Sequence, residues 1–151
     1  IMLGRTLGGA TVAVIQGIVV FIICMLLGFA PQNIFGILIS FVFMFLIALF
    51  FTSLGTAIAS MLEDMQAFPL IMNFLVMPIF FLSGALFPLD GLEGIIKIVT
   101  LIDPLTYGVD GLRASLTGAA HIGIVVDFLV LIVLTTIVLA IGAKIFSRIQ
   151  V

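Results

Sequence analysis

Long apolar runs are the feature that most limits how this chain can fold. Four of them, at residues 6–29, 34–62, 67–87 and 128–146, contain almost no charged residue. A helix needs about 20 apolar residues to cross a hydrocarbon core about 30 Å thick, and only helices or closed barrels satisfy their backbone groups there. The runs lack the alternating pattern of barrel strands. The sequence therefore predicts an all-α, polytopic membrane helix bundle with four transmembrane helices.

Composition excludes a water-soluble domain. Charged residues make up 8% of the chain and hydrophobic residues 64%, with a mean hydropathy of +1.55, whereas soluble domains carry about 25% charged residues. The five basic residues are scattered, so no nucleic-acid surface is expected. We expect residues 1–151 to form a single transmembrane domain in contact with lipid.

Charge placement predicts the orientation of this domain. An even number of spans puts both termini on one side of the membrane. Arg5, Lys144 and Arg148 flank that side, against Lys97 and Arg113 on the other. Because basic residues concentrate in cytoplasmic loops, both termini are predicted to be cytoplasmic. The chain starts with an apolar run and no initiator methionine, so we expect a fragment.

Small residues at four-residue spacing mark expected helix contacts. Gly9, Ala13 and Gly17 lie on one face of the first span, and Gly55 and Ala59 on one face of the second. Small residues let membrane helices approach closely. Both faces are therefore predicted to pack against other helices.

Half of the chain's charged residues lie between residues 87 and 113. Residues 90–102 predict a short amphipathic helix, with Asp90 as N-cap, Glu93 as its capping partner, and a Glu93–Lys97 ion pair one turn apart. Asp103 and Pro104 predict the start of a second short helix.

The second helix is expected to stop near Gly118 and to contain an Asp110–Arg113 ion pair. Each helix is too short to span a bilayer. The pair is therefore predicted to be interfacial or re-entrant, before the last span. Asp127, which adjoins that span, is expected at its boundary, where a helix N-terminus favours a carboxylate.

Two motifs carry a family resemblance. The stretch "FFLSGALFPLDGL", followed by "IDPLTYGVDGLRASLTG", resembles the signature of ATP-binding-cassette (ABC) type-2 permeases, the membrane subunits of drug and polysaccharide exporters. The resemblance covers essentially the whole chain. By that likeness the signature positions, on the two short helices and the span before them, are Phe80, Phe81, Ser83, Gly84, Pro88, Pro104, Tyr107, Asp110 and Arg113.

The resemblance also implies function and partners. It implies the last four of six spans, and a plasma-membrane exporter subunit that works as a homo- or heterodimer with a nucleotide-binding subunit. It implies that the two short helices cap the transport path externally. Glu63 and Asp64 would lie in a cytoplasmic turn that can touch the ATPase, although a merely solvated turn is an equal alternative.

The chain offers little chemistry of its own. His121 is the single histidine of the chain, so no histidine-based metal site or triad is expected within it. No "GxxxxGK[ST]" phosphate loop occurs. We therefore expect a transport subunit rather than an enzyme, without a cofactor in this chain, and with ATP and Mg²⁺ bound by a partner. The alternatives are a secondary transporter or channel, which would need central ionisable groups, and a passive membrane anchor.

Overall fold

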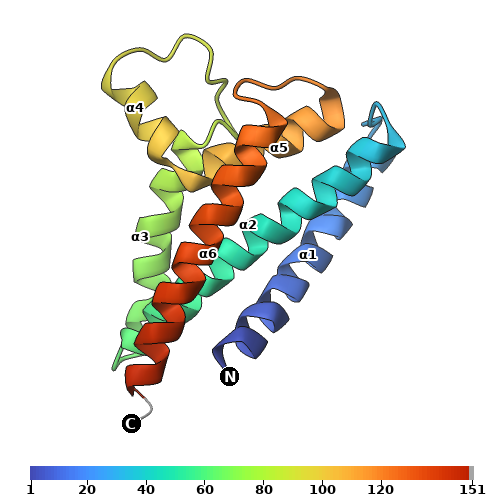
Figure 1. Ribbon diagram of the computed structural model, residues 1–151. Helices are drawn as coiled ribbons and strands as arrows, with labels where there is room; N and C mark the ends of the chain where they lie inside the picture. The colour runs from blue at the N-terminus through green and yellow to red at the C-terminus, as the bar shows by residue number, and fades with distance from the viewer. Residues whose placement is uncertain (150–151) are drawn as a thin grey trace.

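The computed structural model describes residues 1–149 and is helical throughout, with no strand in that range. Figure 1 shows the long helices side by side, with both described ends of the chain at one end of the bundle. This architecture confirms the all-α membrane bundle. Its helices are α1 (Met2–Leu26), α2 (Ile34–Met61), α3 (Ala67–Leu82), α4 (Ile95–Ile102), α5 (Pro104–Thr117) and α6 (Ile124–Ile149).

Three helices are long and apolar enough to cross a membrane: α1, α2 and α6. The third predicted span is shorter than expected, because α3 has 16 residues, or about 24 Å at 1.5 Å per residue. It ends at Leu82, where Ser83 and Gly84 follow, and Gly84 has a φ of 79°. The count of four spans is therefore not confirmed, although α3 runs from the end of α2 toward the opposite end of the bundle (Figure 1).

The second helix is the centre of the bundle. α2 packs along α1, α5 and α6, and its Phe43 side chain is fully buried beside the Phe128 ring of α6. On α1, a Cβ at Gly9 would meet Thr52 Cγ2 at 2.5 Å, and one at Gly17 would meet the Met44 sulfur. The backbone of α1 thus lies so close to α2 that a larger residue at Gly9 or Gly17 would require Thr52 or Met44 to move.

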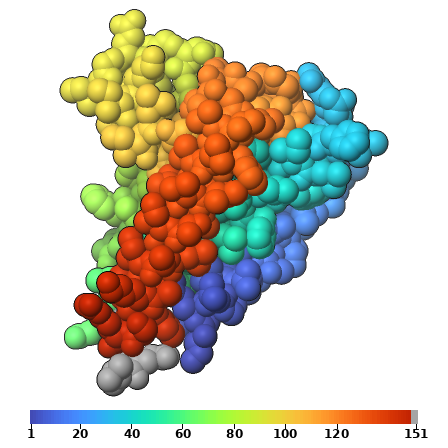
Figure 2. Space-filling view, viewed as in Figure 1, coloured from blue at the N-terminus to red at the C-terminus, as the bar shows by residue number. Residues whose placement is uncertain are grey.

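The outside of the bundle is apolar. Large hydrophobic side chains remain exposed along all three long helices, as at Leu3, Phe35 and Val125. Figure 2 shows α6 along the front of the molecule, with α4 and α5 gathered above it at one end. An apolar exterior of this extent suits lipid as the surrounding solvent.

The two predicted short helices are present as the α4–α5 hairpin, residues 95–117, but the first begins later than expected. Asp90 and Glu93 lie in the loop of residues 83–94, so the predicted capping box and the Glu93–Lys97 ion pair are both wrong within residues 1–149. Gly91 and Gly94, with φ of 87° and 65°, explain the difference. Helical φ is negative, and these two glycines take positive values that end any helix through them.

The expected boundaries of the second helix are confirmed. The Asp103 side chain accepts a hydrogen bond from the Leu105 N–H at 2.9 Å, and Pro104 occupies the first helical position. Gly118 terminates α5 in the left-handed conformation, with a φ of 74°.

Candidate functional site

The α4–α5 hairpin lies at the end of the bundle opposite both described chain ends (Figure 1). α5 packs against α2 and α6 through a face of small and polar residues. The buried members of that face are Thr106, Gly108, Asp110, Gly111, Ala114 and Ser115. A helix with such a face can approach its neighbours closely.

Three glycines make this close approach possible. A Cβ at Gly108 would meet Ile47 Cγ1 at 2.5 Å, and one at Gly111 would overlap the Phe43 ring. On α2, a Cβ at Gly36 would overlap the backbone carbonyl of Ser115. The position of α5 is thus fixed on α2 by backbone contact as well as by side chains.

Arg113 joins α5 to the end of α3. Its Nη2 donates a hydrogen bond to the Gly84 carbonyl oxygen at 2.8 Å, across 29 residues of sequence. Ser83 is fully buried beside it and donates to the Phe80 carbonyl. The structure therefore brings together three of the residues that carry the resemblance.

Asp110 joins α5 to the start of α6. Its carboxylate accepts hydrogen bonds from the His121 N–H at 2.9 Å and the Ile122 N–H at 2.8 Å. The predicted Asp110–Arg113 pair is wrong, because Asp110 binds the 118–123 loop and Arg113 binds the end of α3. Burial alone would raise the pKa of Asp110, but the backbone N–H donors outweigh it and leave that pKa below its ordinary value.

The junction between α4 and α5 is closed by further hydrogen bonds. Thr106 Oγ1 donates to the Thr100 carbonyl and the Tyr107 hydroxyl donates to the Leu101 carbonyl, both at 2.7 Å. Asp103 is buried at this corner, and its Oδ2 has no hydrogen-bond partner among residues 1–149. Burial raises the pKa of Asp103 to about 6, against the opposing effect of the Leu105 and Thr106 N–H groups.

Other predicted site residues lie apart from this cluster. Phe80 and Phe81 contact each other edge to face and are partly exposed, and Pro88 is exposed in the 83–94 loop. Glu63 and Asp64 occupy the exposed turn between α2 and α3, at the far end of the bundle. Gly55 and Ala59 line an open groove beside α3 instead of a tight helix contact.

Asp127 is in the first turn of α6, close to where the sequence placed it, but its surroundings differ. The side chain is fully buried and neither carboxylate oxygen has a hydrogen-bond partner within residues 1–149. The sequence could not show this burial, because it arises from the packing of α5 against α6.

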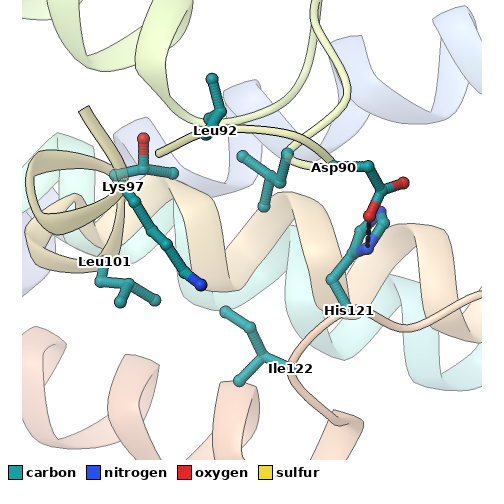
Figure 3. Close-up of a pocket in the computed structure, with 8 residues that line it drawn as sticks. Asp90, Leu92, Lys97, Leu101, His121 and Ile122 are labelled. Atoms are coloured by element: carbon teal, nitrogen blue, oxygen red, sulfur yellow. Dashed lines mark ion pairs between the residues drawn. The ribbon is translucent and has the colours of Figure 1, made fainter. Parts of the chain in front are cut away.

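A cavity beside the hairpin contains residues that sequence reasoning did not bring together. It measures about 240 Å³. His121 Nδ1 lies 3.3 Å from Asp90 Oδ1, and Figure 3 shows the Lys97 ammonium directed toward Ile122 across the same space. The lining is Leu89, Asp90, Leu92, Lys97, Thr100, Leu101, His121 and Ile122. No group of three or more metal-ligating side chains occurs within residues 1–149.

Comparison with known proteins identifies the family of this chain. Residues 1–117 match the family model described as ABC-2 type transporter, and the chain belongs to that family. It is therefore similar to the membrane components of ABC transporters. The match includes the bundle up to the last residue of α5.

Two relatives illustrate the likeness. The chain is 29% identical over 126 residues to Nodulation protein J of Rhizobium meliloti (strain 1021), which covers 82% of this chain and 47% of that protein. It is 27% identical over 137 residues to Nodulation protein J of Rhizobium leguminosarum bv. trifolii, covering 87% and 52%. The chain thus spans about half the length of these relatives. No solved structure gives a significant match.

Proposed function

We propose that this chain is part of the permease subunit of an exporter that is driven by ATP hydrolysis on a partner subunit. Family membership supports a permease role. The observation that carries the rest is the polarity of the bundle, with the α4–α5 hairpin at one end and the Glu63–Asp64 turn at the other (Figure 1). A subunit that is driven by ATP hydrolysis on one side of the membrane, and that opens a path to the other side, needs two structurally different ends.

In this proposal the hairpin covers the path on the outer side of the plasma membrane, and the chain termini are cytoplasmic. Two permease copies, identical or different, form the path between them. The turn that contains Glu63 and Asp64 contacts the nucleotide-binding subunit, which holds ATP and Mg²⁺. The exposure of both acids is what makes them available for such a contact.

Topology is tested by cysteine accessibility in the full-length protein, with Cys24 replaced by Ser. Cysteines at Glu93 and at Asp64 should react with an impermeant thiol reagent from opposite sides of the membrane. Reaction of both from the same side would refute the proposed orientation.

Energy coupling is tested by co-purification and transport. A nucleotide-binding subunit should co-purify with the full-length permease, and reversal of both charges with Glu63→Lys and Asp64→Lys should weaken that association. The matched control is Glu93→Lys, an exposed acid in the 83–94 loop, which should leave the association unchanged. Retention of the subunit by the double variant would refute the contact. Export that continues with an inactive ATPase would refute the energy source.

A further inference from the structure

The cavity beside the hairpin is built from three segments that are separate in sequence. The 83–94 loop contributes Asp90, α4 contributes Lys97, and the 118–123 loop contributes His121. The Asp90 side chain, which is 78% exposed, lies 3.3 Å from His121 Nδ1, so the two loops meet at one side of the space (Figure 3). The cavity is therefore a product of the folded hairpin.

Charge is distributed unevenly in this cavity. The partner expected for Lys97 was Glu93, but α4 begins after Glu93. Asp90, the other nearby acid, lies against His121. Within residues 1–149, Lys97 has no ion pair and no side-chain hydrogen bond. Its ammonium enters the cavity, where Asp90, the acid among the described lining residues, already contacts His121.

The remaining walls are mostly apolar. They are lined by Leu89, Leu92, Leu101 and Ile122. The Thr100 hydroxyl already donates a hydrogen bond to the Ile96 carbonyl. At roughly 30 Å³ per water molecule, the volume admits about eight water-sized groups. A ligand that satisfies this space needs one anionic group for Lys97 and a short apolar portion for the leucine and isoleucine side chains.

We propose that this cavity binds a phosphate or carboxylate group attached to an apolar body. Lys97 binds the anion. His121, oriented by Asp90, forms the opposite wall. The apolar body lies on the four aliphatic side chains. The same chemistry is presented by an anionic lipid headgroup at the membrane surface and by an anionic amphiphile in transit. Only the second source rests on the proposed export function.

The test uses butyl phosphate as the probe and the full-length protein in phosphatidylcholine nanodiscs, followed by ³¹P NMR titration. Lys97→Met should weaken binding about tenfold or more, as expected for loss of a charge-assisted contact. Lys97→Arg should retain binding. Lys144→Met, a matched lysine on α6 at the other end of the bundle, should leave it unchanged. Inorganic phosphate should bind more weakly than butyl phosphate because it lacks the apolar portion.

Equal affinities for the wild type and Lys97→Met would overturn the site, as would equal weakening by Lys144→Met. Inorganic phosphate that binds as tightly as butyl phosphate would overturn the role of the apolar walls.

The source of the ligand is distinguished by adding phosphatidylglycerol to the discs. Competition that disappears in Lys97→Met supports a lipid headgroup at this site. Unchanged butyl phosphate affinity supports a transported molecule. Lost binding in Lys97→Met with ATP-independent export would refute the proposed function but not the site. Unchanged binding with ATP-dependent export would refute the site but not the proposed function.

Discussion

Substitution of Gly36 by alanine tests the contact that positions the hairpin. A methyl group there would overlap the backbone carbonyl of Ser115 on α5, which cannot rotate away as a side chain could. Overpacking of this kind costs about 1–3 kcal/mol, and a backbone neighbour places it at about 3 kcal/mol. Alanine also stabilises the helix by about 1 kcal/mol relative to glycine, because its helix propensity is higher. We therefore expect a net loss of about 2 kcal/mol in the free energy of unfolding.

The matched control is Gly8→Ala on α1, because no heavy atom outside its own helix lies within 4 Å of the added Cβ. That variant should gain about 1 kcal/mol from propensity alone. Size-exclusion chromatography after heating in detergent measures both. At about 2–4 °C per kcal/mol for a chain of this size, Gly36→Ala should melt about 4–8 °C lower and Gly8→Ala slightly higher than the wild type. Equal melting temperatures for the two variants would refute the close approach of α2 and α5.

Three further predictions use the same preparation. Asp103→Asn should remove a pH dependence of stability. The raised pKa of about 6 means that the folded state binds the proton of Asp103 more tightly than the unfolded state does. Wild-type stability should therefore fall as pH rises from about 4 to 6. The difference in melting temperature between variant and wild type should therefore change over that range, and a flat difference would contradict the burial of a charged Asp103. Arg113→Met should remove the bond to the Gly84 carbonyl and speed proteolysis of the 83–94 loop about tenfold, for a contact of roughly 1.4 kcal/mol; an unchanged cleavage rate would show that the bond does not hold the loop. Gly9→Leu should destabilise by about 1–3 kcal/mol through its overlap with Thr52, whereas its exposed neighbour Gly8→Leu should not, and similar melting of both would contradict the contact with α2.

Sequence patterns predicted the elements whose causes are local. Long apolar runs gave α1, α2 and α6, because hydrophobic length determines a membrane helix wherever it lies in the chain. Asp103, Pro104 and Gly118 gave both ends of α5, because capping acts within a few residues. The start of α4 was wrong for an equally local reason. Gly91 and Gly94 take positive φ, which ends any helix through them whatever the pattern of apolar and charged residues.

The site could be predicted only in part, because its contacts are distant in sequence. The sequence placed Asp110 and Arg113 one turn apart on a helix, and the favourable pairing of such neighbours predicted an ion pair. In the structure Asp110 binds the N–H groups of the 118–123 loop and Arg113 binds Gly84. Nothing local in the sequence sets these choices. Gly84 and Arg113 are both among the positions that the resemblance implies, and the structure joins them by a hydrogen bond.

The two helices of the hairpin are held very differently. α5 has six buried residues and packs on both α2 and α6. α4 has eight residues, of which only Thr100 is buried, and its neighbours are α3 and α5. Ile95, Ile98 and Ile102 are at least 60% exposed. Few buried contacts give a low free energy of local opening.

We therefore expect α4, with the cavity that it borders, to open while α5 stays fixed to the bundle. Hydrogen exchange followed by mass spectrometry should show faster exchange of backbone amides in residues 95–102 than in residues 104–117. The hydrogen bonds from Thr106 and Tyr107 to α4 oppose that opening. Thr106→Val should therefore accelerate hydrogen exchange in α4 and leave the exchange rate of α5 unchanged. Equal protection of the two helices would mean that the hairpin opens as one body and would contradict the separate opening of α4.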